Sequence, residues 1–231
     1  MSLQQPRSWP IIERWFPHRE AWSRPVHAGW LLSVFVLLGG LPYTVINQVA
    51  GQRNTSVFHV ETSLDTMLPF VPWMMVPYVS FYAYFPLMFW MGSRVDRRPQ
   101  AERLTLRLVQ ATWIAFAIFL LLPVEVDLRH QITPVEGVLG LAFDTLHTWD
   151  TPYNAWPSLH VLQSLLVVLT VRTWLAEEAR AGAPIYGLIW AAWGLLVLST
   201  LLVKQHYLFD VATAIVLAAT VWKVWFKPTF N

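Results

Sequence analysis

The sequence contains no cysteine among its 231 residues, which excludes disulfide bonds, thiolate nucleophiles, zinc–thiolate sites and iron–sulfur clusters. Charged residues are scarce as well: they make up 13% of the chain, against about 25% in an average soluble domain. Lysine is the scarcest of them and occurs only late in the chain, at Lys204, Lys223 and Lys227. This balance excludes an intrinsically disordered chain, a disulfide-stapled secreted module and a soluble nucleic-acid-binding protein.

Long apolar stretches are what the sequence does contain, and hydrophobic residues make up 55% of it. A helix needs about 20 residues to cross a membrane. The apolar stretches predict spans near residues 26–46, 68–91, 105–123, 158–172, 184–203 and 207–226. We therefore expect an all-α, polytopic integral-membrane protein in which residues 26–231 form a bundle of six transmembrane helices.

The N-terminal segment, residues 1–25, interleaves tryptophan, isoleucine and phenylalanine with arginine and glutamate. It lacks the continuous apolar core of a signal peptide. We expect an amphipathic helix that lies at the membrane interface, with a disordered tail as the alternative.

The positions of arginine and lysine predict the orientation, because cytoplasmic segments of membrane proteins are enriched in both. If the N-terminus is cytoplasmic, every basic residue except Arg53, Arg129 and Lys204 falls on the cytoplasmic side. Both termini are therefore predicted to be cytoplasmic. The membrane would be a bacterial inner membrane or a eukaryotic endomembrane.

Two polar clusters stand at the ends of predicted spans, where ionisable side chains are costly and hence candidates for function. The first is residues 157–160, Pro-Ser-Leu-His, at the start of the fourth span; the second runs from Lys204 to Asp210, between the fifth and sixth spans. The predicted topology brings both to the outer membrane level. His206 and Asp210 are four residues apart, so on a helix the carboxylate can accept a hydrogen bond from one imidazole nitrogen and leave the other free.

This pattern is typical of an oriented nucleophile. His160 could protonate a leaving oxygen, and Lys204 could supply positive charge. The Ser158 hydroxyl and the N–H groups that open the fourth span could hold phosphate oxygens. The residues thus suit phosphoryl transfer through a phosphohistidine.

A metal site is the rival interpretation, because two histidines and one carboxylate also form a facial triad. Lys204, two residues from His206, would repel a divalent cation and attract a phosphate. We therefore expect neither a metal nor another cofactor.

The two clusters resemble the second and third signature motifs of the type 2 phosphatidic acid phosphatase superfamily, which includes integral-membrane lipid phosphatases and phosphotransferases. The second motif is usually Pro-Ser-Gly-His, and residues 157–160 match it except at glycine. The third usually ends in His-x-x-x-Asp after an arginine, where this chain has Lys204. The similarity spans about residues 60–226. Within the superfamily, the chain is similar to the inositol phosphorylceramide synthases and their bacterial relatives over residues 64–72, 150–161 and 199–210.

The resemblance implies a role for each matching residue. His206 would be the nucleophile, Asp210 would orient it, and His160 would act first as acid and then as base. Ser158 and Lys204 would hold the phosphate, and no metal would be needed.

The superfamily's first motif, Lys-x6-Arg-Pro, has no counterpart here because all lysines lie late in the chain. Arg129 is the best replacement as a phosphate-binding cation, with Arg53 behind it; the alternative for Arg129 is a solvated arginine in a loop. Asp65 could bind a hydroxylated acceptor, or it could simply favour the start of a helix.

We therefore expect a metal-independent lipid phosphatase or lipid phosphotransferase with its active site on the periplasmic or luminal side. A membrane lipid phosphate would be the substrate, and water or a lipid alcohol would be the acceptor. The alternative is a non-catalytic carrier or binding protein for an anionic lipid, with Lys204 and the histidines as its pocket.

Overall fold

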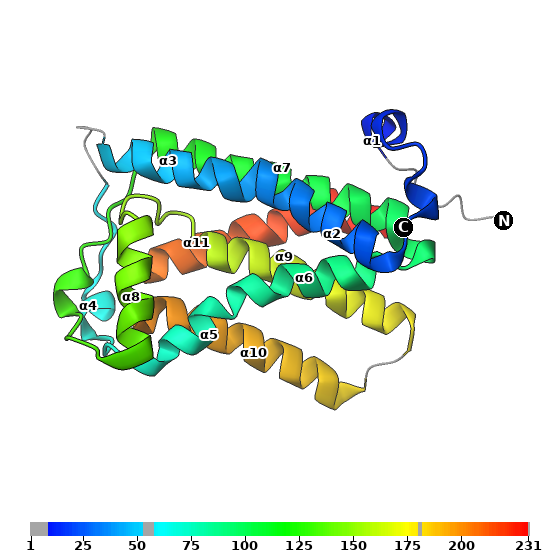
Figure 1. The fold of residues 1–231 in the computed structure, drawn as a ribbon. Coiled ribbons are helices and arrows are strands. Elements are labelled where there is room, and N and C mark those ends of the chain that lie inside the picture. The colour runs from blue at the N-terminus through cyan, green and yellow to red at the C-terminus, as the bar shows by residue number, and fades with distance from the viewer. Residues whose placement is uncertain (1–8, 53–57, 180–181, 231) are drawn as a thin grey trace.

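The computed structural model describes residues 9–52, 58–179 and 182–230, and over these residues the protein is an all-helical bundle (Figure 1). Five helical stretches of the described chain are long and apolar enough to cross a membrane. They are Arg24–Gln52, Val95–Leu121, Leu159–Glu177, Ala183–Leu202 and Leu208–Thr229. These helices indicate a multi-pass integral-membrane protein, and the expected all-α fold is confirmed.

Some of these stretches change helical type along their length. The first consists of α2 (Arg24–Phe35), the π-helical turn η2 (Val36–Gly40) and α3 (Leu41–Gln52), and the second of η4 (Val95–Arg97) and α7 (Arg98–Leu121). The next two are α9 (Leu159–Glu177) and α10 (Ala183–Leu202), and the last consists of α11 (Leu208–Val221), η6 (Trp222–Phe226) and η7 (Lys227–Thr229).

The predicted second span, residues 68–91, is not one continuous helix. It consists of the turn η3 (Pro72–Met74), α5 (Met75–Val79) and α6 (Phe81–Gly92). Proline lacks a backbone N–H and crowds the preceding turn, and the segment contains several prolines, which explains the interruption. The broken segment still runs along the bundle, because α5 packs on α10 and α6 packs on α2 and α9 (Figure 1).

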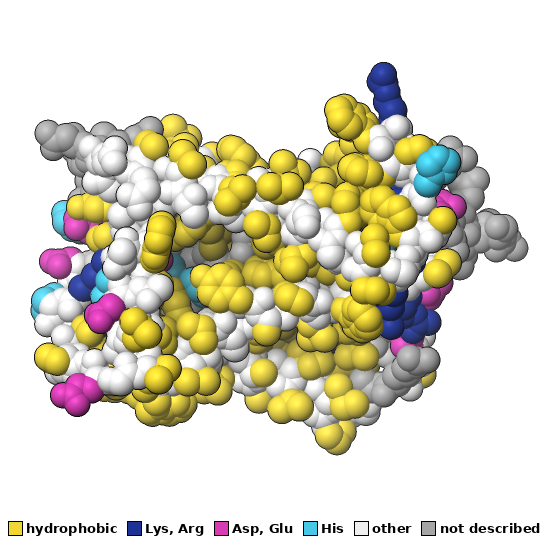
Figure 2. Space-filling model, in the orientation of Figure 1, with side chains coloured by type: hydrophobic (Ala, Val, Ile, Leu, Met, Phe, Trp, Pro, Cys, Tyr) yellow, Lys and Arg dark blue, Asp and Glu magenta, His cyan; other side chains and the backbone are white. Residues whose placement is uncertain are grey.

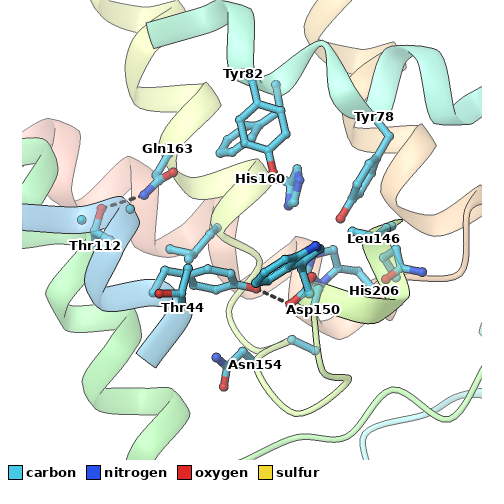
Figure 3. Close-up of a pocket in the computed structure, with 18 of the residues that line it drawn as sticks. Thr44, Tyr78, Tyr82, Thr112, Leu146, Asp150, Asn154, His160, Gln163 and His206 are labelled. Atoms are coloured by element: carbon cyan, nitrogen blue, oxygen red, sulfur yellow. Dashed lines mark hydrogen bonds between the residues drawn. The ribbon is translucent and has the colours of Figure 1, made fainter. Parts of the chain in front are cut away.

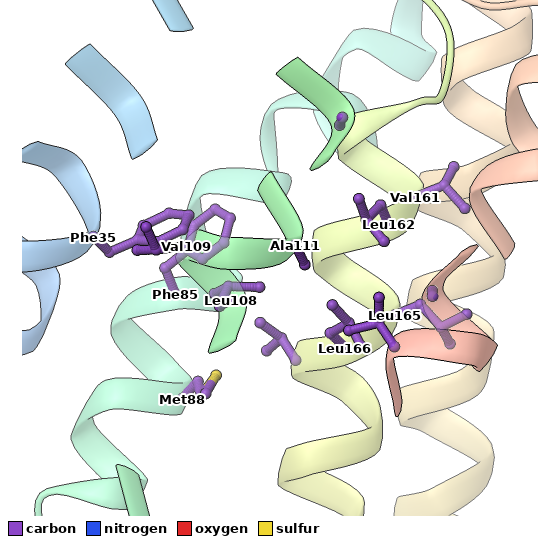
Figure 4. Close-up of a cluster of buried hydrophobic side chains, with 14 of the residues drawn as sticks. Phe35, Phe85, Met88, Leu108, Val109, Ala111, Val161, Leu162, Leu165 and Leu166 are labelled. Carbon is purple, nitrogen blue, oxygen red and sulfur yellow. The ribbon is translucent and has the colours of Figure 1, made fainter. Parts of the chain in front are cut away.

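The hydrophobic core lies where α2, α6, α7 and α9 meet (Figure 4). Leu108 and Phe116 of α7 are fully buried there, as are Leu162 and Leu166 of α9. Apolar side chains at a spacing of three to four residues place one face of each helix toward the others. This core holds α9, and with it one of the predicted catalytic residues, in a fixed position.

One end of the bundle carries short helices that lie between the predicted spans. These are α4 (Ser63–Met67) and α8 (Gly137–Trp149), which lies in the long connection between the third and fourth predicted spans. Figure 1 shows α4 and α8 at the end of the bundle opposite to the start of α2 and to η7. The candidate site lies at the α4 and α8 end.

The N-terminal segment is described from Trp9 onward. It contains the short helix α1 (Pro10–Trp15) and the turn η1 (Arg19–Ala21). Arg19 Nε donates to Glu102 Oε1 at 2.8 Å, which anchors η1 to α7. The expected interfacial role of residues 1–25 stays a prediction.

Candidate active site

The turn between α10 and α11 carries the second polar cluster. Lys204 has a φ of 61°, in the left-handed region that residues other than glycine rarely adopt. Its ammonium group donates to the carbonyl oxygens of Leu68 at 2.6 Å and of Asp65 at 3.3 Å, and the side chain is fully buried. Lys204 therefore ties the turn to the segment that precedes η3.

Two carboxylates bind the N-terminus of α11, directly after His206. Asp210 Oδ2 accepts the backbone N–H of Tyr207 at 2.8 Å, and Asp65 Oδ1 accepts that of Leu208 at 2.7 Å. The first N–H groups of a helix have no partner inside the helix, so both bonds satisfy donors that would otherwise be left unpaired. They fix the backbone on which His206 stands.

Asp65 serves two helix starts at once. Its Oδ2 accepts the backbone N–H of Thr62 at 2.8 Å and the Thr62 hydroxyl at 2.6 Å, which completes a capping box on α4. The side chain is 1% exposed. Of the two roles that the sequence left open for Asp65, the structure supports the one at a helix start.

Replacing Asp65 by alanine should therefore destabilise the protein by about 2–4 kcal/mol, because several donors lose their acceptor in a buried place. Thermal unfolding in detergent would measure this. Asp144→Ala on α8 is the control, because the Asp144 side chain makes no hydrogen bond to another element of the described structure. An unfolding temperature equal to that of the control would contradict the capping role.

The Nδ1 atom of His206 lies 3.4 Å from Oδ2 of Asp210. Both side chains are buried, with 6% and 0% exposed. An acceptor at Nδ1 leaves the other ring nitrogen, Nε2, free to react. His206 also lines a cavity of the described structure.

His160 stands on the first turn of α9 and faces the same cavity. Its ring stacks on Tyr78, with centroids 4.3 Å apart, and contacts Phe81 at 4.3 Å. The ring centroids of His160 and His206 are 5.9 Å apart. His160 Nε2 is buried and has no hydrogen-bond partner among the described residues. The first turn of α9 and the turn before α11 thus bring the two histidines together, and Nε2 of His160 is left unpaired among the described residues.

Ser158 lies beside the histidines but does not line the cavity in the described structure. It is fully buried, its hydroxyl accepts the Val161 N–H at 3.4 Å, and its own N–H donates to the Asp210 carbonyl at 3.4 Å. Ser158 therefore caps α9 and joins it to α11. Phosphate binding by Ser158 stays a prediction.

The two predicted cations of the described chain both line the cavity. Arg129 Nη2 donates to the Asp150 carbonyl at 2.6 Å, and burial lowers the pKa of its guanidinium. Burial also lowers the pKa of Lys204, and the charge of Asp65 opposes that shift. The third candidate, Arg53, lies outside the described residues.

Asp150 and Asn154 are cavity residues to which the sequence analysis gave no role. Asp150 Oδ1 accepts the Tyr43 hydroxyl at 2.5 Å and Asn47 Nδ2 at 2.7 Å. Burial raises the pKa of Asp150, while the Tyr43 hydrogen bond and the charge of His206 lower it. Both polar atoms of the Asn154 side chain are buried without a partner among the described residues. The sequence could have indicated Asp150 and Asn154 only through their position just before the polar cluster at residues 157–160.

The cavity has a volume of about 530 Å³ and two parts of different chemistry. The polar part holds His160, His206, Arg129 and Asp150, and Figure 3 shows the two histidines and Asp150 around it. The other part is apolar and runs between the helices; its walls include Leu32, Phe35, Val36, Phe85 and Phe116. Figure 2 shows the surface hollowed between α3 and α6, with hydrophobic side chains beside the hollow.

The chemistry of this site follows from its donors and acceptors. It offers a buried imidazole with an aspartate on one nitrogen, and a second imidazole with an unpaired nitrogen facing the same space. Over the described residues, no three His, Asp or Glu side chains are arranged to hold a metal ion. The arrangement suits nucleophilic attack by one histidine and proton transfer by the other.

Comparison with known proteins gives one result at the level of the family. No curated protein and no solved structure matches the chain significantly. The PAP2 superfamily matches over residues 52–224, which is more than half of the chain and includes both polar clusters. The chain therefore belongs to the PAP2 superfamily, the type 2 phosphatidic acid phosphatases and their relatives.

Proposed function

We propose that the protein is an integral-membrane, metal-independent lipid phosphatase or lipid phosphotransferase that acts through a phosphohistidine at His206. The observation that carries this proposal is the two-part cavity. A lipid phosphate has a charged group at one end and apolar chains at the other, and the cavity has a histidine pair at one end and an apolar passage at the other. Membership of the PAP2 superfamily supports the same class of reaction.

The reaction would proceed in two steps. In the first, His206 Nε2 forms a bond to phosphorus while the bond between phosphorus and the lipid oxygen breaks, and His160 gives its proton to that oxygen. In the second, water or a lipid alcohol attacks phosphorus, its proton passes to His160, and the phosphorus–nitrogen bond breaks. Asp210, 3.4 Å from Nδ1, would stabilise the positive charge that the His206 ring gains.

The acceptor decides whether the reaction is hydrolysis or transfer, and the first step is the same for both. The similarity of residues 150–161 and 199–210 to inositol phosphorylceramide synthases favours transfer to a lipid alcohol. Adding ceramide or diacylglycerol would divert the phosphoryl product from free phosphate if the protein is a transferase.

The orientation in the membrane is part of this proposal. We place the site end, with α4 and α8, on the periplasmic or luminal side and both termini in the cytoplasm. Figure 2 shows lysine and arginine gathered at the end opposite to α4 and α8, as the enrichment of basic residues in the cytoplasm favours. The broken segment α5–α6 would also cross the membrane and, with the five long helices, would make six crossings. The exposed Ile11 and Trp15 of α1 would lie in the membrane interface.

Phosphate release in excess EDTA tests the function directly. Protein purified in detergent is expected to release inorganic phosphate from phosphatidic acid, a polyprenyl diphosphate or a sphingoid phosphate at the same rate with and without the chelator. Rates that fall with EDTA and recover with a divalent cation would contradict the metal-independent mechanism. No release, with or without a lipid alcohol, would favour an anionic-lipid carrier.

A further inference from the structure

Gln163 is a polar residue inside a membrane-spanning helix that the mechanism above does not use. It stands on α9, three residues beyond His160, lines the cavity and is 5% exposed. Residues three apart lie on the same helix face, so Gln163 is about 4.5 Å deeper in the passage than His160. A polar side chain at membrane depth is costly, which makes it a candidate for function.

The hydrogen bonds around Gln163 determine which way its amide points. The Thr112 hydroxyl donates its only proton to the Leu108 carbonyl at 2.9 Å. The Thr112 oxygen can therefore only accept a hydrogen bond from Gln163, whose Nε2 lies 2.7 Å from Thr112 Oγ1. The amide nitrogen must face Thr112, and this hydrogen-bond network assigns the amide orientation.

The carbonyl oxygen of Gln163 is the group left over. No hydrogen bond reaches it from the described residues, whereas the nitrogen is paired. Figure 3 shows the Gln163 oxygen on the side of Tyr82 and His160, away from Thr112. It thus faces the passage as an acceptor without a donor, at the place where the polar part of the cavity gives way to the apolar part.

We propose that Gln163 determines specificity by accepting a hydrogen bond from the linkage region of the lipid. The proposal rests on the proposed function, which places phosphorus at His206 and the linkage region one helical turn deeper. A lipid with an amide N–H or a hydroxyl there satisfies the Gln163 oxygen. A linkage made only of esters offers a second acceptor, and both oxygens would then be desolvated without a bond.

A matched pair of lipids tests this. One is a diacylglycerol phosphate, and the other is the same molecule with the ester at its central carbon replaced by an amide. We expect kcat/KM for the amide lipid to be about fivefold higher, the factor that one neutral hydrogen bond is typically worth. In Gln163→Leu the ratio should fall to about one, because the rate with the amide lipid falls most.

Thr112→Val provides a second variant that keeps the glutamine. Without the Thr112 oxygen the amide is free to turn, so the preference for the amide lipid should also shrink. The matched control is Thr105→Val, which removes the same kind of bond from α7, Thr105 to the Ala101 carbonyl at 2.8 Å, at a buried position away from the cavity. This control should keep the full preference.

Binding to His206→Ala separates this proposal from the proposed function. The amide lipid should raise the unfolding temperature of His206→Ala more than the ester lipid does. This difference should vanish in the double variant His206→Ala, Gln163→Leu. Absence of turnover in the wild-type protein would refute the proposed function and leave this binding difference to decide the role of Gln163. Equal stabilisation by the two lipids, or a preference that survives Gln163→Leu, would overturn the proposal.

Discussion

Replacing His206 by alanine is expected to lower the rate of phosphate release at least about a thousandfold, because the attacking nitrogen that Asp210 orients is gone. The variant should still fold. The caps on α11 come from Asp65 and Asp210 and reach the backbone of Leu208 and Tyr207, not the His206 ring. Initial rates in detergent, with circular dichroism and unfolding temperature as checks of the fold, would measure both expectations.

This variant also separates a catalyst from a lipid carrier. Asp210→Asn keeps an acceptor for the Tyr207 N–H but removes the negative charge beside His206, so it should lower the rate about a hundredfold or more. In a carrier, His206→Gln and Asp210→Asn would cost only a modest part of the lipid affinity. Full activity of His206→Ala would contradict its assignment as nucleophile.

Replacing His160 by alanine should have an effect that depends on the leaving group. With an alkyl lipid phosphate the leaving alkoxide needs a proton, so we expect a loss of about a hundred- to ten-thousandfold. An aryl phosphate leaves as a stable phenolate, so its first step should fall less than about tenfold. Comparing the two substrates in the wild-type protein and the variant gives the measurement.

The second step supplies an independent test of the same residue. His160 would accept the proton of the attacking water, so its loss should slow the breakdown of the phosphohistidine. With an aryl phosphate, His160→Ala should therefore release a burst of phenol equal to the number of sites and accumulate an acid-labile phosphoprotein. An equal loss with both substrates and no burst would show that His160 supports the site only by its packing on Tyr78 and Phe81.

Local sequence patterns predicted much of this protein. The apolar stretches identify five of the helices long enough to span a membrane, because burying that much apolar surface in a bilayer depends on composition over about 20 residues and on little else. The four-residue spacing of His206 and Asp210 predicted their contact, which the structure shows at 3.4 Å, but His206 lies in the turn before α11 (Leu208–Val221) and not on its first helical turn as expected. The order of the spans predicted that residues 157–160 and 204–210 face the same membrane level, and His160 and His206 line one cavity.

Other features depended on partners far away in the chain. Lys204 binds the Leu68 carbonyl, and Asp150 accepts from Tyr43; neither pair has a local signature. The prolines of residues 68–91 are local features that account for its interruptions, but nothing local predicts that α5 packs on α10 and that α6 packs on α2 and α9.

The sequence by itself determined that the protein is helical and lies in a membrane, and it singled out His160 and His206 as candidate site residues, because each of these follows from composition or from short motifs. Only the tertiary structure decided which cations are already bonded to the backbone, which carboxylate caps a helix, and which way the Gln163 amide points. The physical reason is that a buried polar group must find its partner wherever the fold provides one, and that partner can lie a hundred residues away.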